Sequence, residues 1–299
     1  MQRKSVWTAI ALVLLVALAA GQSQEQYLDV FTVQVKPEKR ADFDAIAKKI
    51  AAANHQNKGD AWLAMETMYG PGDRVSFISM RSSYGDVDNA MGAFYGSMQK
   101  AYGEAGTKKL FQDFSQCVVS TRTEFRRRRW DLSSNVPADP AAVSKMIGDA
   151  RVLRTTAVHV KPGQVAAFEA LLKEMKSARE KASPPLTALV SQVVAGQEGT
   201  VFYVTTLQNS LSGFDKVPTT QQLLGDDGYA KYLKTVADVV ENAETMINRF
   251  LPELSNAPEE VVAAAPDYWT PRTMVAAKAK APKGVVNAAE MAKEEKPKP

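Results

Sequence analysis

Apolar and polar residues alternate along two separate stretches of the chain, and each alternation stops at a Lys-Pro pair. The stretches are residues 31–35 and 158–160. Alternation with a period of two predicts a strand that buries one face. Beyond each Pro the apolar residues recur three and four positions apart, as on one face of an amphipathic helix: Phe43, Ile46, Ala47, Ile50, and then Phe168, Leu171, Leu172, Met175. Each stretch therefore predicts a strand, a Pro-marked corner and a helix.

The two stretches are copies of one another. Four residues recur 125 positions later, namely Val33, Lys36, Pro37, Phe43 as Val158, Lys161, Pro162, Phe168. Phe77 and Phe202 keep the same spacing, and so do Phe125 and Phe250. A spacing held over this length predicts a duplicated domain of ordinary size.

Both copies predict the same order of elements, which is strand, helix, two hairpin strands, helix and strand. In the first copy the later elements are strands at 62–69 and 75–80, helical segments within 84–116 that break near 103–106, and a strand at 118–125. In the second copy they are strands at 186–194 and 201–207, a helix at 229–243, and a strand at 245–251. This order is that of a ferredoxin-like unit.

A strand that ends in Val-Lys-Pro-Gly, followed by a helix with Phe six residues after the Pro, resembles the dimeric α/β-barrel superfamily. The nearest likenesses are to its antibiotic-biosynthesis-monooxygenase-like and NIPSNAP-like domains, here as a tandem repeat over about residues 27–128 and 152–252. Gly163 completes the motif in the second copy, whereas Glu38 replaces that Gly in the first. The resemblance implies an α+β fold in which two tandem ferredoxin-like (βαββαβ) units pack sheet to sheet, with a cavity between them.

The ends of the chain differ from these units in composition. Arg3 and Lys4 precede an apolar run of about fifteen residues, which is shorter than the roughly 20 that span a bilayer. We therefore expect a bacterial protein exported to the periplasm or the medium, with no stable membrane span after cleavage; the alternative is an uncleaved N-terminal anchor. The predicted organisation is a signal peptide at 1–21, units at 22–130 and 151–254, a linker at 131–150, and a mostly disordered Ala/Lys/Pro-rich tail at 255–299.

Composition and charge exclude several classes of function. The formal net charge of +4 falls to +2 without Arg3 and Lys4, which is too balanced for a nucleic-acid partner. The basic run at 126–129 is interpreted as a solvated strand end. Cys117 is the single cysteine, so no intramolecular disulfide forms, and its apolar strand predicts a buried thiol. No metal-ligand spacing connects it to His55 or His159, so no metal site is expected.

His159 is the first candidate for a site residue. It lies between Val158 and Val160, so it points away from the face on which those valines pack, and Gln34 holds the matching place in the first copy. Such a residue could act as a base, a ligand contact or an axial haem ligand, or it could be a structural His at the cavity rim. His55, at a helix C-terminus, is interpreted as exposed.

Charged residues within the predicted strands complete the set. Glu66 faces either the cavity or water, while Arg122 and Glu124 share one strand face, and the spacing of 125 matches Arg249 to Glu124. A structural ion pair is the commoner explanation of such charges, and a ligand site is the alternative. The predicted ligand-binding candidates are therefore His159, Gln34, Glu66, Arg122, Glu124 and Arg249, with no catalytic residue assigned.

Three functions are consistent with this sequence. The first is a non-catalytic envelope protein that binds a small apolar molecule in the barrel or serves as a scaffold, with no cofactor. The second, implied by the resemblance alone, is a cofactor-independent monooxygenase-like enzyme. The third and weakest is haem binding, because chlorite-dismutase-like proteins also pair two ferredoxin-like units and need an axial His.

Overall fold

The structure is a computed structural model, and it describes residues 26–270. The predicted signal peptide and residues 271–299 of the predicted tail lie outside the described residues. Across residues 26–270, no helix combines the length and the hydropathy that a bilayer crossing requires.

The described chain contains the βαββαβ order twice, as the sequence predicted. The first unit consists of β1 (Tyr27–Val35), α2 (Arg40–Asn57), β2 (Leu63–Tyr69), β3 (Arg74–Arg81), α3 (Tyr84–Gln116) and β4 (Val118–Arg128). The second consists of β5 (Val152–Val160), α5 (Val165–Lys181), β6 (Leu189–Ala195), β7 (Thr200–Gln208), α6 (Thr220–Val239) and β8 (Val240–Phe250).

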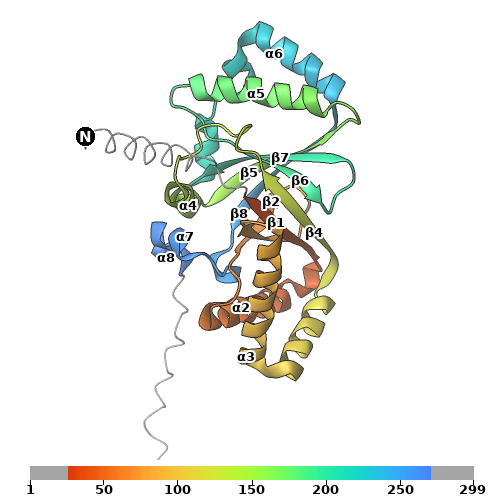
Figure 1. Ribbon diagram of the computed structural model, residues 1–299, viewed down its shortest axis with the longest axis vertical. Coiled ribbons are helices and arrows are strands. Elements are labelled where there is room, and N and C mark those ends of the chain that lie inside the picture. Colours follow the sequence, from red (N-terminus) through yellow and green to blue (C-terminus); the bar gives the residue numbers. More distant parts are fainter. Residues whose placement is uncertain (1–25, 271–299) are drawn as a thin grey trace, which may run out of the picture.

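The eight strands close into one antiparallel barrel in the order β1-β3-β2-β8-β5-β7-β6-β4. Each unit supplies four adjacent strands, and the units join along two seams, β2 with β8 and β4 with β6. Helices α2 and α3 cover one side of the barrel, and α5 and α6 cover the opposite side (Figure 1). The predicted fold is therefore confirmed, with both units in one chain.

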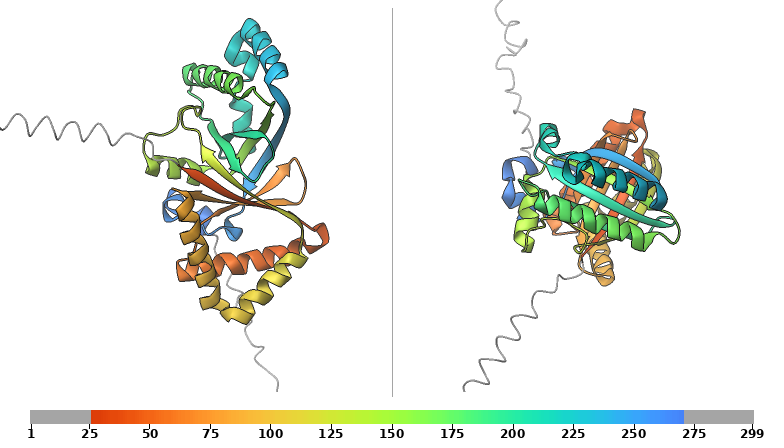
Figure 2. Two further views of the ribbon diagram at one scale, coloured as in Figure 1. Left: turned by 45° about the vertical axis from the view of Figure 1, so that its right-hand side comes forward. Right: turned by 90° about the horizontal axis from the view of Figure 1, so that it is seen from above.

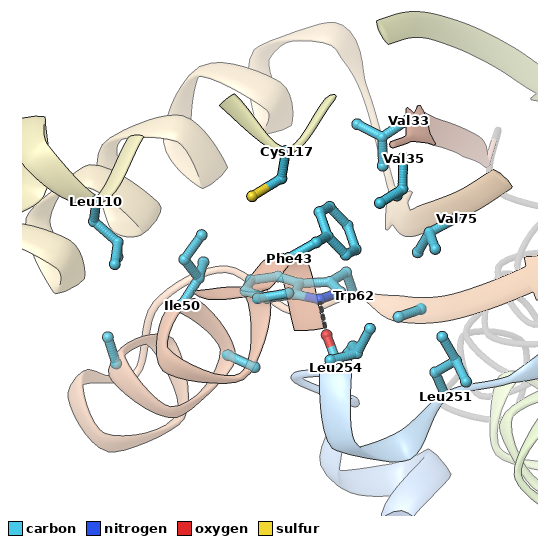
Figure 3. Packing of buried hydrophobic residues seen from close by; sticks show 14 of the residues in the cluster. Val33, Val35, Phe43, Ile50, Trp62, Val75, Leu110, Cys117, Leu251 and Leu254 are labelled. Atoms are coloured by element: carbon cyan, nitrogen blue, oxygen red, sulfur yellow. Dashed lines mark hydrogen bonds between the residues drawn. The ribbon is translucent and has the colours of Figure 1, made fainter. Parts of the chain in front are cut away.

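The space between strands and helices is filled by apolar side chains. Val33, Phe43 and Val75 are fully buried between β1, α2 and β3, and the Trp62 indole donates a hydrogen bond to the Leu254 carbonyl at 2.8 Å (Figure 3). Cys117 is buried in the same cluster, and burial raises the pKa of its thiol. Since these strand residues point outward, the residues that alternate with them face the barrel interior.

The predicted bounds of the last helix and strand were wrong. The helix begins at Thr220, where the side chains of Thr219 and Gln222 form a capping box, and the chain then turns at Gly225 with a positive φ of 69°. A Gly- and Asp-rich stretch therefore lies within the helical region instead of before it. Strand β8 begins at Val240 because Val240 pairs with Val160, so tertiary pairing decides the boundary.

The spacing of 125 holds at the first strand of each unit and changes later. Gln34 pairs with Arg74 on β3 and Ser120 on β4, whereas His159 pairs with Val201 on β7 and Asn242 on β8. The equivalent positions are therefore 127 apart in the third strands (201 − 74) and 122 apart in the fourth (242 − 120). It follows that Arg249 corresponds to Arg127 and not to Glu124, which corrects the predicted match.

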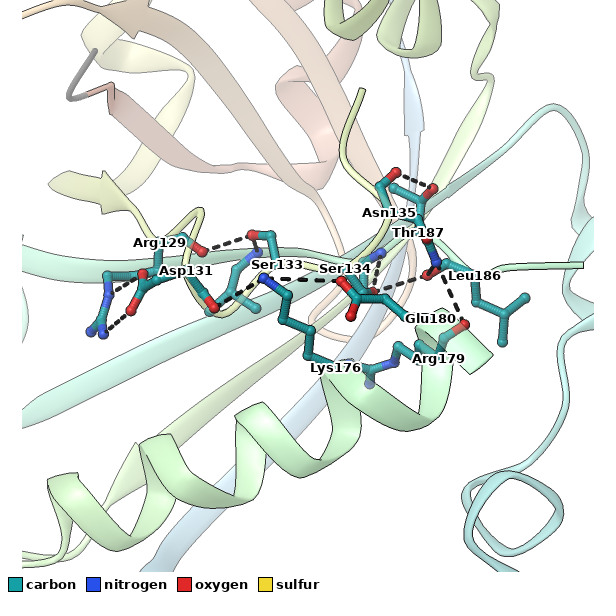
Figure 4. Close-up of polar contacts among 12 residues, drawn as sticks. Arg129, Asp131, Ser133, Ser134, Asn135, Lys176, Arg179, Glu180, Leu186 and Thr187 are labelled. Carbon is teal, nitrogen blue, oxygen red and sulfur yellow. Dashed lines mark hydrogen bonds and ion pairs between the residues drawn. The ribbon is translucent and has the colours of Figure 1, made fainter. Parts of the chain in front are cut away.

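The segment predicted as a linker is tied to the second unit. The Lys176 ammonium donates to the Asp131 carbonyl at 3.2 Å, and the Asn135 amide donates to the Leu186 carbonyl at 3.0 Å (Figure 4). The segment then forms α4 (Pro140–Asp149), which opens where the sequence places Asp139 before a Pro. Asp139 accepts a hydrogen bond from the Ala142 amide at 2.7 Å as the N-cap.

Residues 255–270, assigned to the tail from sequence, fold against the barrel as well. They include α7 (Glu259–Ala264) and α8 (Pro266–Trp269). Trp269 is buried, donates to the Gly148 carbonyl at 2.9 Å, and lies 5.3 Å from the Phe250 ring. Helices α4, α7 and α8 thus gather at one end of the barrel (Figures 1 and 2), which we call the closed end. The opposite end, where β1 and β5 finish, is called the open mouth.

Candidate ligand-binding cavity

The barrel interior encloses a cavity of about 890 Å³, lined by side chains from every strand. Strands β1 and β5 run from the closed end to the open mouth, so their inward residues order the lining by depth. Near the closed end the lining is mostly apolar: Leu28, Leu63, Met80, Leu153, Leu189, Leu207, Phe250. Near the open mouth it is mostly polar: Gln34, Arg74, Ser120, Arg122, His159, Asn242, Glu244. The cavity is therefore amphipathic along its axis.

His159 and Gln34 lie at equivalent places in the open mouth, and both line the cavity. Val158 and Val160 pack in the core under α5, so His159 does point away from that core. The Gln34 amide donates to the Gly72 carbonyl of the β2–β3 turn at 2.8 Å. His159 is half-buried, and its imidazole hydrogen-bonds to no group within residues 26–270.

Glu124 also lines the cavity, and its carboxylate is fully engaged. One oxygen accepts hydrogen bonds from the Gln197 amide at 2.7 Å and the Tyr203 hydroxyl at 3.3 Å. The other accepts from Arg126 at 2.8 Å, and this guanidinium lies 3.5 Å from the centre of the Tyr203 ring. Burial raises the pKa of Tyr203, which keeps the phenol protonated. Such a carboxylate is occupied by its hydrogen bonds and positions its neighbours.

Two of the predicted cavity residues do not face the cavity. Met65 and Thr67 line it, so the alternation along β2 turns Glu66 to the outside of the barrel. There Glu66 accepts hydrogen bonds from Arg40, at 2.5 Å, and from Arg249 on β8. Burial alone raises the pKa of Glu66, but the hydrogen bonds from both arginines offset it and hold the pKa below its ordinary value. Glu66 and Arg249 form an ion pair across the seam and do not belong to the cavity.

The arginine run was also misinterpreted as a solvated strand end. Strand β4 continues to Arg128, so alternation sends Arg126 and Arg128 into the cavity and Arg129 outward. Arg129 is buried and donates to Asp131 at 2.7 Å and to Gln192 at 2.8 Å. The period-two pattern could have found these inward residues if the strand had been extended past Phe125. Arg122, by contrast, lies at the open mouth, lines the cavity there and is exposed.

Arg128 differs from the other arginines of the lining. Its Nε is buried without a hydrogen-bond partner, and its guanidinium carbon lies over the Trp130 ring, 5.4 Å from the ring centre. Burial, and then the neighbouring charge of Arg126, lowers the pKa of Arg128 to about 10. Within residues 26–270, no carboxylate forms an ion pair with it.

The described part of the chain brings no three His, Cys, Asp or Glu side chains together as a metal site would need. The lining therefore offers hydrogen-bond donors, an engaged carboxylate and apolar walls.

No family model matches the chain, and no curated protein matches it. Solved structures share its fold at low identity. An anthrone oxidase-like protein is 14% identical with a TM-score of 0.50, over 77% of this chain and 93% of that one. A proposed monooxygenase from Lactobacillus acidophilus is 10% identical over 76% and 94%, with a TM-score of 0.47. A haem-binding protein from Thermus thermophilus is 11% identical over 78% and 93%, with a TM-score of 0.43.

At these identities the likeness concerns the fold alone. Together with the strand order, it shows that the chain has the dimeric α/β-barrel fold, with both ferredoxin-like units in a single polypeptide.

Proposed function

We propose that the protein binds a small, largely apolar molecule inside the barrel and performs no covalent chemistry on it. The observation that carries the proposal is the cavity of about 890 Å³, whose closed end has an apolar wall. Volumes of this order are typical of sites for small molecules. The signal peptide expected at residues 1–21 would place this binding protein outside the cytoplasm.

The state of the polar groups favours binding over catalysis. Glu124 is engaged by three donor residues, and Cys117 lies in the core under α2 and α3, away from the cavity. His159 stands alone at the open mouth, without the orienting partner that a general base usually has. A cofactor-independent oxygenase is the competing enzyme function, and its test is oxygen consumption with electron-rich phenols.

Haem would need an axial ligand, and His159 is the cavity residue that could supply one. A metal-bound His ordinarily donates its second ring N–H to a carboxylate or a carbonyl, which fixes the ring. Within residues 26–270, no protein group gives His159 such a bond. The residues present therefore do not fit an axial haem site.

The test is a titration of the purified protein with N-phenyl-1-naphthylamine, a neutral apolar fluorophore. We expect saturable binding at one site per chain. Ala157→Trp and Thr32→Phe, which add bulk to the cavity lining from opposite units, should each weaken binding at least about tenfold. Ala45→Trp, on the exposed face of α2, is the control for an added aromatic ring and should leave binding unchanged.

Circular dichroism of each variant separates a filled cavity from a misfolded barrel. Binding that survives both cavity-filling variants, or no binding by the unmodified protein, would contradict the proposal.

A further inference from the structure

We propose that the ligand carries an anionic group and that Arg128 binds this group deep in the barrel, so that the preferred ligand is a carboxylic acid with a hydrocarbon body. This inference rests on the proposed binding function and names the chemical class of its ligand.

The first argument is that no carboxylate within residues 26–270 pairs with the Arg128 charge, whose neighbour is the Trp130 ring. A buried charge without a partner is strongly unfavourable, so buried arginines are normally paired. Arg126 is paired with Glu124, Arg129 with Asp131, and Arg81 with Asp60. Arg81, Arg127 and Arg179 also have a buried nitrogen without a hydrogen-bond partner, but none of the three lines the cavity. Among the arginines of the described residues that line the cavity, Arg128 is the one with a buried nitrogen that has no hydrogen-bond partner. Burial, and then the charge of Arg126, also lowers its pKa.

The second argument comes from the repeat. The offset of 122 in the fourth strands makes Phe250 the counterpart of Arg128 (250 − 122 = 128). Phe250 lines the same cavity and packs on Trp269. One unit therefore places an aromatic ring at a depth where the other places a guanidinium, so a ligand at this depth has an apolar wall on one side and a cation on the other.

The third argument is the surroundings of Arg128. Ser191 is opposite Arg128 in the register between β4 and β6, is buried, and lines the cavity. Its hydroxyl can donate a second hydrogen bond to an anion held by the guanidinium. Leu189 and Leu28 line the same end of the cavity. A carboxylate bound by Arg128 would thus have its hydrocarbon chain in contact with apolar side chains, which a free inorganic anion would leave uncovered.

The test compares three probes by isothermal titration calorimetry: decanoate, decanol and acetate. Decanol has the same chain without the charge, and acetate has the charge without the chain. We expect decanoate to bind the unmodified protein at least about tenfold more tightly than decanol, with acetate binding weakest.

Variants then assign the charge to a residue. Arg128→Met should abolish the preference for decanoate while decanol still binds, and Arg128→Lys should retain part of it. Arg122→Met is the matched control, because Arg122 lies on the same strand and lines the same cavity but is exposed at the open mouth. It should leave the preference unchanged.

Each opposite result has a distinct meaning. Equal binding of decanoate and decanol overturns the anionic ligand and leaves the proposed function intact. A preference lost in Arg122→Met and kept in Arg128→Met overturns the role of Arg128. Acetate binding as tightly as decanoate overturns the hydrocarbon body. Failure of decanoate, decanol and the neutral fluorophore to bind overturns the proposed function itself.

Discussion

Glu66 on β2 and Arg249 on β8 lie directly opposite each other across one seam of the barrel, and their equivalents at the other seam are Gln192 and Arg127. The first seam is thus joined by an ion pair, with Arg40 as a third member, and the second by an uncharged side chain beside arginines. Duplication has kept the geometry of both seams while their electrostatics have diverged.

Exchanging the two seam residues tests this difference. Glu66→Gln should lower the free energy of unfolding by about 1–3 kcal/mol, since both arginines lose a charged acceptor. Gln192→Glu is the reciprocal change and should be neutral or slightly stabilising, because Arg129 already donates to Gln192. Urea unfolding of both variants measures the effect, and an unchanged stability of Glu66→Gln would indicate that the ion pair adds nothing beyond an amide.

The same ion pair predicts a pH dependence. The pKa of Glu66 in the folded protein lies below its ordinary value of 4.5, because Arg40 and Arg249 stabilise the charged form. A depressed pKa contributes stability at pH values above 4.5, and that contribution disappears as the pH falls through the folded-state pKa. The stability difference between the unmodified protein and Glu66→Gln should therefore be constant from pH 6 to 8 and shrink below about pH 4.5. A difference that is as large at pH 3 as at pH 7 would contradict this.

Arg126 and Arg128 allow a matched comparison of two inward arginines on one strand. Arg126→Met removes the partner of a buried carboxylate and should destabilise the protein by about 3–5 kcal/mol. Arg128→Met removes a charge without an ion-pair partner and should be neutral or stabilise the ligand-free protein by up to about 4 kcal/mol. Thermal and urea unfolding of the ligand-free protein measure the stability of both variants. A large loss of stability in Arg128→Met would show that the charge of Arg128 is compensated within the fold.

Substitutions at two glycines of the β6–β7 turn distinguish the cost of backbone strain from the cost of a steric clash. Both have positive φ, but a Cβ on Gly196 would lie 2.1 Å from the Thr123 carbonyl oxygen, whereas one on Gly199 would meet nothing within 4 Å. Gly199→Ala should cost about 1–2 kcal/mol from its φ alone. Gly196→Ala should cost clearly more, because the turn must move away from β4. Equal costs in urea unfolding would argue against close contact at this seam.

Trp269 tests the closed end. Trp269→Ala should lower the free energy of unfolding by about 3–5 kcal/mol, since a buried ring that packs on Phe250 is lost. Tyr268→Phe, which removes only a hydroxyl that donates to the Phe250 carbonyl, is the milder control and should cost about 1 kcal/mol. Fluorophore binding should weaken in Trp269→Ala as the closed end loosens, and unchanged binding and stability would contradict a closing role for α8.

The sequence was informative wherever local chemistry and tertiary structure agree. Val33 with Val35, and Val158 with Val160, predict strand faces that the structure buries, and Pro37 marks the corner before α2. The fold followed from these signals because each unit repeats them.

The site was less predictable, because it depends on which residues pair across strands. A constant spacing of 125 matched Arg249 to Glu124, whereas the real spacing in the fourth strands is 122. An error of one residue in the position along a strand assigns a side chain to the wrong face of the barrel. A large aromatic residue before a polar, Ala/Lys-rich segment suggests docking on the domain, but the sequence does not show where Trp269 docks, because it is buried through contacts with α4 and Phe250.

Fusion of the two units in one chain has a geometric consequence. A barrel made from two identical chains has every inward side chain twice, related by a two-fold axis, so a molecule with one charged head would find two equivalent orientations. Here Arg128 lines the interior in the first unit, and Phe250 occupies the equivalent position in the second. After duplication, one of two equivalent positions could thus change while the other stayed the same. The interior therefore differs from one side of its diameter to the other, which a symmetric pair of identical chains does not allow.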